Sequence, residues 1–192
     1  MNQFITLTNR QYPISDYDRP KQLVQAPLAK KGLLIVSEVA EKFEQLVKHT
    51  NLENDIVIVD AYRSKATQQQ LWQETLRDKG ELFTNRYVAR PGCSEHELGL
   101  AIDVGLSKKN NDFIRPSFID SPIVDCFLEN MTDFGFILRY PKNKETITNI
   151  SFEPWHFRYV GTPHSQIMTQ QDWVLEEYIE FLVSTRGEVN EY

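Results

Sequence analysis

Apolar side chains recur at helical spacing in the first third of the chain and predict an amphipathic helix over residues 28–50. An apolar stripe opposite a charged face is typical of a helix that packs on a core. A second helix is predicted over residues 65–79, ended by Gly80, and a third begins at Ser121 and ends at Gly135. The apolar positions of the first helix are Val36, Val39, Ala40, Phe43, Leu46 and Val47.

Short β-branched or alternating runs predict the strands. Residues 56–59 read Ile-Val-Ile-Val between two aspartates, which is typical of a strand buried on both faces. In residues 100–106 bulky side chains alternate with small ones, and Asp103 lies on the small face. Residues 136–140 and 156–160 predict two further strands. Strands and helices do not alternate regularly, so we predict an α+β fold with a small antiparallel sheet flanked by helices.

The two ends of the chain carry weaker signals. Three prolines interrupt the first 27 residues, which favours an extended arm laid over the domain rather than a helix. Residues 169–172 resemble a capping box and predict the start of a C-terminal helix. A chain of 192 residues can bury a core of its own. We therefore predict one domain over residues 1–192, with an arm of about residues 1–27.

Charge and composition narrow the function. The formal net charge is −6 and basic residues do not cluster, so a nucleic-acid partner is not expected. No run of 18 apolar residues and no signal-peptide pattern is present, which predicts a cytoplasmic protein without a membrane span. Two cysteines are too few for a disulfide scaffold and suit a reducing compartment. The oligomeric state stays open, with a homodimer among the alternatives.

The stretch from Ser94 to Asp103, Ser-Glu-His-Glu-Leu-Gly-Leu-Ala-Ile-Asp, concentrates groups that can bind a metal. Asp103 follows His96 by seven residues, roughly 23 Å in a straight strand, so a shared ion requires a reversal between them. Gly99 can supply the positive φ that such a turn needs. The stretch therefore predicts a bent metal site in a cleft over the sheet.

A second motif, Glu153-Pro154-Trp155-His156, offers a third ligand and a base. Pro154 argues against a helix, so this is a turn that enters a strand. Two imidazoles and one carboxylate suit Zn²⁺ and leave a coordination position for water. Glu153 is then free to act as the general base of amide hydrolysis. Arg63, at the exit of the buried strand, can stabilise the charge that develops on the attacked carbonyl oxygen.

These motifs resemble the zinc D-Ala-D-Ala peptidases of the VanY, VanX and VanXY type, within a larger group that includes L,D-carboxypeptidases. The resemblance covers most of the chain and rests on Tyr62-Arg63-Ser64, on the Ser-x-His-x-x-Gly-x-Ala-x-Asp pattern and on the Glu-Pro-Trp-His motif. It implies that His96, Asp103 and His156 bind zinc, that Glu153 is the catalytic base and that Arg63 stabilises the transition state. It also implies substrate contacts by Gln68 and Ser94.

The chain is most similar to the cytoplasmic VanXY branch. This resemblance implies a hydrolase, specifically a metallopeptidase, that cleaves the D-Ala-D-Ala dipeptide and removes the C-terminal D-Ala of peptidoglycan pentapeptide precursors. Small peptides that end in D-Ala-D-Ala are the implied partners. Such an activity removes the target of vancomycin, so a role in glycopeptide antibiotic resistance is implied.

Several alternatives stay open at the level of sequence. The chain can be an L,D-carboxypeptidase or another cell-wall peptidase with the same metal site, or an inactive module that binds peptidoglycan peptides. Cys93 lies three residues before His96 and would be the fourth ligand of a closed structural zinc site. Asp60 is either a structural partner of Arg63 or a contact for the ammonium group of a free dipeptide.

Overall fold

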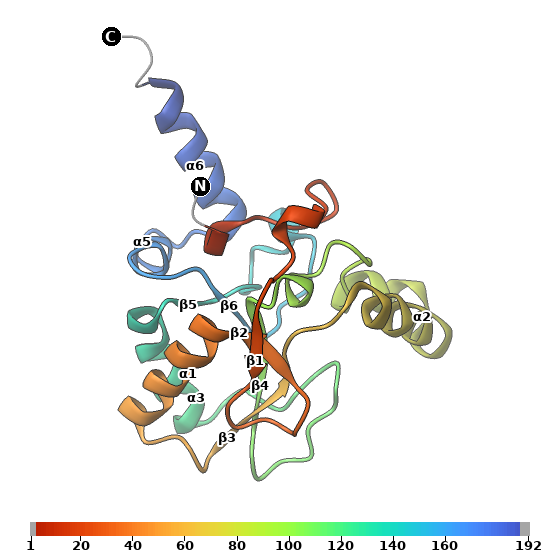
Figure 1. The fold of residues 1–192 in the computed structure, drawn as a ribbon, viewed down its shortest axis with the longest axis vertical. Helices are drawn as coiled ribbons and strands as arrows, with labels where there is room; N and C mark the ends of the chain where they lie inside the picture. Colours follow the sequence, from red (N-terminus) through yellow and green to blue (C-terminus); the bar gives the residue numbers. More distant parts are fainter. Residues whose placement is uncertain (1–2, 189–192) are drawn as a thin grey trace.

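A four-stranded antiparallel sheet forms the centre of the molecule, which is shown in Figure 1 as a computed structural model that describes residues 3–188. Its strands lie in the order β3-β4-β6-β5. The α+β fold and all four strands agree with the sequence prediction. The strands are β3 (Ile56–Asp60), β4 (Ala101–Leu106), β5 (Phe136–Leu138) and β6 (His156–Tyr159).

One face of the sheet carries the main hydrophobic core. Helices α1 (Ser37–Thr50) and α3 (Pro122–Asn130) cover this face, and the short 3₁₀ helix η4 (Met131–Phe134) continues α3 up to Gly135. Because side chains alternate along a strand, every second residue of β4 and β6 enters this core. Its fully buried members include Phe43, Leu46, Ile58, Ile102, Val104, Phe127, Phe136 and Phe157.

The predicted helix over residues 28–50 is wrong in its first part. Strands β1 (Leu23–Gln25) and β2 (Leu34–Val36) pair as a separate antiparallel hairpin, and α1 begins only at Ser37. The connection between these strands turns at Gly32, which has a φ of 98°. The apolar helical stripe starts at Val36, so the apolar residues before it belong to a strand pattern that the prediction merged with the helix.

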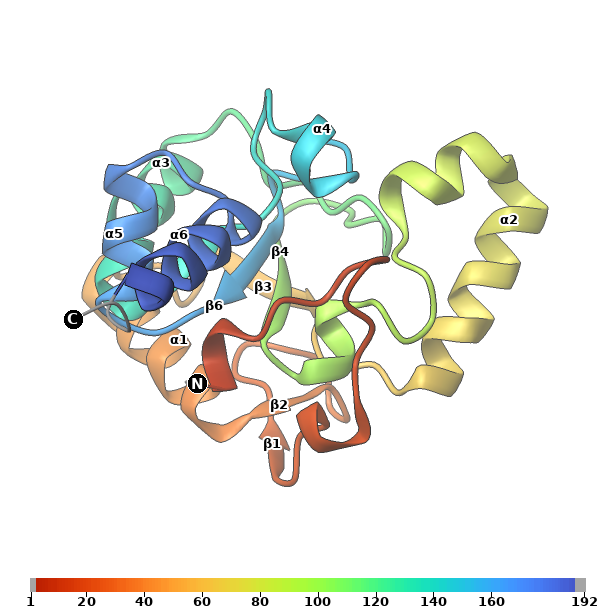
Figure 2. The ribbon, with the colours of Figure 1, turned by 90° about the horizontal axis from the view of Figure 1, so that it is seen from above.

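Helix α2 (Lys65–Tyr87) is longer than predicted and extends away from the body of the molecule (Figure 2). Gly80 does break it, with φ 80° and ψ 171°, but helical structure resumes on the other side. Glycine reaches this backbone region without steric cost, so it allows a kink within one long element. Gly80 therefore marks a break in the helix and not its end.

The C-terminal part contains three helices, α4 (Glu145–Thr148), α5 (His164–Gln170) and α6 (Leu175–Glu188). The predicted capping box over residues 169–172 is wrong, because Thr169 lies inside α5. The cap of α6 is instead a carboxylate of the helix itself, since the Val174 N–H donates to the Glu177 side chain. Helices α5 and α6 bury a second, smaller hydrophobic cluster against β5 and the arm.

The N-terminal arm runs across the molecule with two short 3₁₀ turns, η1 (Gln3–Ile5) and η2 (Asp16–Asp18). The guanidinium of Arg158 donates to the carbonyl oxygens of Phe4 and Thr6, and so binds the arm to β6. No helix within residues 3–188 combines the length and the hydropathy that a membrane-spanning segment needs.

Candidate metal centre

The face of the sheet opposite the main core carries the candidate site, formed by polar side chains of β3, β4 and β6. Asp103 of β4 and His156 of β6 are paired in the strand register, so their side chains lie side by side. Asp60 of β3 reaches the same face through a β-bulge, which places Ile58 opposite Val104 but Asp60 opposite Asp103. Such a bulge inserts one extra residue and re-aims the side chain that follows it.

His96 comes to this face on a 3₁₀ turn, η3 (Glu95–Leu98), that reverses the chain before β4. The turn ends at Gly99 in the left-handed region, with φ 65°, as the sequence predicted. The Nδ1 of His96 lies 2.6 Å from the carbonyl oxygen of Ala61. A carbonyl oxygen can only accept, so Nδ1 carries the proton and Nε2 is left with a free electron pair. This Nε2 lies 3.4 Å from Oδ2 of Asp103.

His156 is presented by the tight turn that contains Glu153 and Pro154. The N–H of His156 donates to the carbonyl oxygen of Glu153 at 3.3 Å, which closes this turn just before β6 begins. The Nδ1 of His156 lies 2.9 Å from Oδ1 of Asp103 and 3.8 Å from a carboxylate oxygen of Glu153. The two imidazoles approach edge to face, with ring centroids 5.0 Å apart.

The three predicted ligands fit a divalent metal ion. One ligand atom from each of His96, Asp103 and His156 lies within 4.8 Å of the other two, and all three residues are buried. Two donor atoms held by a tetrahedral zinc ion are roughly 3.3 Å apart. The two histidine–aspartate separations, 3.4 Å from His96 and 2.9 Å from His156, are close to this value. Cys93 is not a member of this ligand group, so within the described residues the geometry does not support the closed four-ligand site.

The electrostatics of the cluster are those of a site for a cation. Burial disfavours the charged form of His156, but the hydrogen bond with Asp103 and the nearby carboxylates of Asp103, Glu95 and Glu153 outweigh it and raise its pKa to about 9. Burial likewise opposes ionisation of Asp103, yet the two histidines hold its pKa well below the usual range. A protonated imidazole is thus stabilised where a metal ion would place its own charge.

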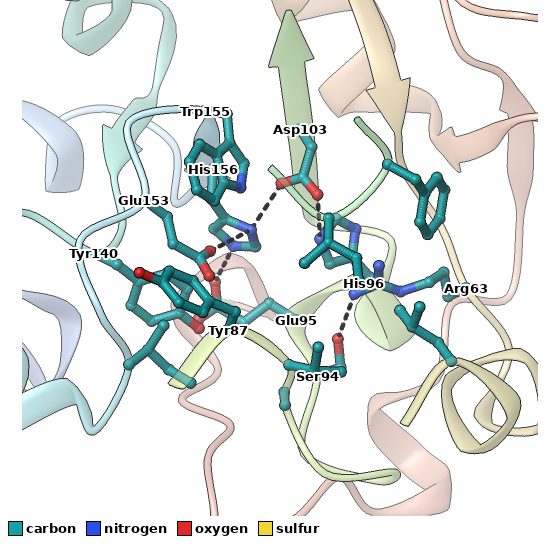
Figure 3. Close-up of a pocket in the computed structure, with 16 residues that line it drawn as sticks. Arg63, Tyr87, Ser94, Glu95, His96, Asp103, Tyr140, Glu153, Trp155 and His156 are labelled. Carbon is teal, nitrogen blue, oxygen red and sulfur yellow. Dashed lines mark hydrogen bonds and ion pairs between the residues drawn. The ribbon is translucent and has the colours of Figure 1, made fainter. Parts of the chain in front are cut away.

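Glu153 lines the same cavity and lies on the other side of the cluster from Arg63 (Figure 3). Burial is the main cause that raises its pKa to about 8, and the neighbouring carboxylates of Asp103 and Glu95 add to the effect. A carboxylate whose pKa is raised toward neutrality is a stronger base than one in water. Its position and environment therefore suit proton transfer.

Arg63 is held at the opposite wall of the cavity by two contacts. Its Nη1 donates to Oδ2 of Asp60 at 2.5 Å, and its Nη2 donates to the hydroxyl of Ser94 at 3.4 Å. Arg63 and Ser94 line the cavity, whereas Asp60 lies beneath it and is 1% exposed. Of the two roles considered for Asp60, the structure therefore shows the ion pair with Arg63.

Gln68, the other predicted substrate contact, does not reach the cavity. It is fully buried at the base of α2, and its amide nitrogen donates to the carbonyl oxygen of Ala89 at 2.8 Å. Ala89 itself lines the cavity. Gln68 therefore supports the wall of the site through its amide nitrogen, and its Oε1 has no hydrogen-bond partner among the described residues.

The cavity has a volume of about 30 Å³, room for little more than an ion and one or two water molecules. Tyr140 and Trp155 form part of its wall, and the ring of Tyr140 lies 4.9 Å from that of His156. Phe113 and Ile114, from the loop between β4 and α3, line it as well.

Sequence reasoning missed a buried ion network behind His156. Glu95 pairs with Arg139 at 2.7 Å and with Arg158 at 2.8 Å, and all three side chains are essentially inaccessible to water. Burial opposes ionisation of Glu95, but the two arginines hold its pKa well below the usual range. A signal for this network was present in the sequence, because Arg158 stands within the predicted strand over residues 156–160, between the apolar residues Phe157 and Tyr159. An arginine at such a position needs a buried carboxylate as its partner.

The comparisons with known proteins agree with this geometry. Residues 33–162 match the family model described as VanY, D-alanyl-D-alanine carboxypeptidase. The bifunctional D-Ala-D-Ala dipeptidase and D-Ala-D-Ala carboxypeptidase VanXYC of Enterococcus gallinarum is 49% identical over 182 residues, which cover 94% of this chain and 96% of that protein.

Two solved structures are similar over nearly the whole chain. The D,D-dipeptidase VanXYg, crystallised with a D-Ala-D-Ala phosphinate analogue, has a TM-score of 0.87 and 45% identity over 92% of this chain and 70% of that one. A point mutant of the D,D-pentapeptidase VanY from a VanB-type resistance cassette, in complex with Zn(II), has a TM-score of 0.77 and 31% identity. That match covers 93% of this chain and 99% of the VanY chain.

Proposed function

Since the chain belongs to the VanY family of D-alanyl-D-alanine carboxypeptidases, we propose that it is a zinc-dependent D,D-peptidase. It hydrolyses the D-Ala-D-Ala dipeptide and removes the C-terminal D-Ala from peptidoglycan pentapeptide precursors. The observation that carries this proposal is the convergence of a two-histidine, one-aspartate cluster with a buried carboxylate and a fixed guanidinium around one small cavity.

Zinc is the metal that the donor set favours, with His96 and His156 as nitrogen ligands and Asp103 as the oxygen ligand. The similar VanY structure in complex with Zn(II) supports this choice. When bound, zinc lowers the pKa of a coordinated water and polarises the carbonyl group of the scissile amide.

The residues around the cluster supply the remaining parts of an amide hydrolysis. Glu153 takes the proton of the attacking water and later delivers it to the amine of the departing D-alanine. Arg63 donates hydrogen bonds to the carbonyl oxygen as negative charge develops on it. Asp60 and Ser94 hold the guanidinium in place, so its orientation is set before the substrate arrives.

The dual specificity is supported by the 49% identity to the bifunctional VanXYC, which spans almost the full length of both proteins. The same similarity supports a role in resistance to vancomycin-type glycopeptides, because hydrolysis of D-Ala-D-Ala termini removes the target of these antibiotics. We further propose a cytoplasmic location, which two cysteines without a disulfide bond would suit. A homodimer stays a prediction.

The proposal is tested by D-alanine release from D-Ala-D-Ala and, separately, from a pentapeptide precursor. Each substrate is incubated with purified protein, with protein treated with a chelator, and with chelated protein after zinc is restored. Zinc-dependent release from both substrates supports the bifunctional activity, and release from one assigns the narrower activity. No release from either, by protein that binds zinc, would favour an L,D-carboxypeptidase or an inactive peptide-binding module.

A further inference from the structure

Two buried polar atoms face each other behind the metal cluster, and neither has a hydrogen-bond partner among the described residues. They are Nε2 of His156 and Oε2 of Glu95, and they lie 3.5 Å apart. A buried donor or acceptor without a partner is costly, so such atoms are normally satisfied in a folded protein. Each of these two atoms is the natural partner of the other, and a shift of about half an ångström would join them.

Glu95 is placed for this role by its own turn. It directly precedes His96 in η3, so one 3₁₀ turn delivers a predicted ligand and, beside it, a carboxylate for the other histidine. Glu95 and Asp103 lie on opposite sides of the His156 ring (Figure 3), with Nδ1 toward Asp103 and Nε2 toward Glu95. The ring therefore has one nitrogen for the metal and one for Glu95.

We propose that Glu95 is a positioning residue, which accepts the Nε2–H of His156 and thereby holds Nδ1 toward the metal. His96 shows the same principle in a weaker form, because its Nδ1–H donates to the carbonyl oxygen of Ala61. A carboxylate behind a metal-bound histidine orients the ring, selects the tautomer and makes the imidazole a better ligand. The two histidines are thus supported unequally, and His156 has the stronger support.

The carboxylate of Glu95 is itself held by two arginines, and each arginine also binds a segment near one end of the chain. Arg139 binds Glu95 with Nε and uses both terminal nitrogens for Glu176 of α6, at 2.9 and 2.8 Å. Arg158 binds the same oxygen of Glu95 and donates to the backbone of the N-terminal arm. Both arginines act on Oε1, so Oε2 is left for His156. Packing of α6 and of the arm therefore contributes to the geometry of the metal centre.

The test measures metal binding rather than turnover. Zinc affinity of wild type and Glu95→Gln is determined by competition with a chromophoric chelator, and the visible spectrum of each Co²⁺-loaded protein is recorded. We expect Glu95→Gln to bind zinc about 10- to 100-fold more weakly and to shift the Co²⁺ bands, because the neutral amide supports His156 less well.

Glu97→Gln is the matched control. Glu97 lies on the same turn, is equally buried, and accepts from the N–H of Gly92, outside the predicted ligand group. It should leave zinc affinity and the Co²⁺ spectrum at the wild-type values. If Glu95→Gln does not fold, zinc affinity and the Co²⁺ spectrum are measured on Glu95→Asp instead. This variant keeps the negative charge beside the arginines, but its side chain is too short to contact both them and His156, so we expect it to weaken zinc binding as well.

A folded Glu95 variant with wild-type zinc affinity and an unchanged Co²⁺ spectrum would overturn the inference. Glu176→Gln extends the test to α6, and we expect it to weaken zinc binding less than Glu95→Gln does. The inference rests on the proposed metal site, and different results would contradict the metal site and the role of Glu95. Wild-type protein that binds no zinc would remove the site itself, whereas equal zinc binding by wild type and Glu95→Gln would remove only the role of Glu95.

Discussion

Asp103 and His156 lie directly opposite each other on β4 and β6, with Oδ1 of the aspartate 2.9 Å from Nδ1 of the histidine. Their spacing is set by the register of two central strands, and both side chains are buried. Residues on paired strands are held more precisely than residues on loops. Two of the three predicted ligands are therefore positioned by paired central strands, and His96 is added from a turn.

Replacement of Glu153 should separate chemistry from metal binding. Glu153→Ala is expected to retain stoichiometric zinc but to lose kcat by roughly 10²–10⁴-fold, because a general base acts only in the transition state. The measurements are D-alanine release under saturating substrate and zinc content by atomic absorption. Loss of the metal from this variant would instead make Glu153 a ligand.

Removal of a predicted ligand should abolish metal binding. His96→Ala and Asp103→Ala are each expected to lose zinc, since two remaining protein ligands do not complete the site. The wild type should gain thermal stability when zinc is added, and these variants should not. Zinc titration followed by thermal unfolding checks both points, and a variant that still holds one equivalent of zinc would exclude that residue from the ligand set.

The metal-free protein should lose stability as the pH rises from about 5 to about 9. The pKa of Glu153 is raised from 4.5 to about 8 and that of His156 from 6.5 to about 9, so the folded state holds these protons more tightly than the unfolded state. The stability that proton binding to these two groups confers is present at low pH and is lost as the pH rises past their folded-state pKa values. Each unit of pKa difference between the folded and unfolded states contributes about 1.4 kcal/mol to the free energy of unfolding.

Denaturant unfolding in the presence of a chelator, at several pH values, measures this dependence. Glu153→Gln should flatten the curve, because its side chain does not titrate. A metal-free wild type whose unfolding free energy increases between pH 5 and pH 9 would contradict the expectation.

Release of Arg63 from Asp60 should reduce activity on both substrates alike. Asp60→Asn removes the charge that orients the guanidinium, and a small displacement of a catalytic group costs up to about 10²-fold in rate. Asp55→Asn is the control, since Asp55 precedes the same strand and faces Lys108 at the surface. The kcat/KM values for dipeptide and pentapeptide decide the point: a selective loss on the dipeptide would show that Asp60 reads the free ammonium group.

The turn at Gly99 should be required for the position of His96. Gly99→Ala forces an alanine into φ 65° and brings its Cβ within 3.1 Å of Leu23 and Val36. Gly80→Ala is the matched control, because φ is 80° there and no atom lies within 4 Å of the added Cβ. The backbone alone should cost Gly99→Ala about 1–2 kcal/mol in the left-handed helical region. It should cost Gly80→Ala about 1–3 kcal/mol, because φ 80° with ψ 171° is a region that is essentially restricted to glycine. Only Gly99→Ala should also weaken zinc binding, which chelator competition measures.

The local elements were predictable because their signals lie within single segments. The stripe from Val39 to Val47 is a property of one helix, and the alternation around Asp103 is a property of one strand, so neighbouring residues encode both. The β1–β2 hairpin escaped prediction because its pairing joins two segments, and a short apolar run is compatible with either strand or helix.

The sequence by itself determined the chemistry of this protein: two histidines, an aspartate, a glutamate and an arginine occur in motifs whose composition suits a hydrolytic metal centre. The tertiary structure decided what each group contacts. It assigned Asp60 to Arg63 through a bulge, turned Nδ1 of His156 toward Asp103, and placed Glu95 between two arginines behind that ring. Motifs are read from neighbouring residues, whereas these contacts join segments far apart in the chain, and only the packing of the folded protein brings such segments together.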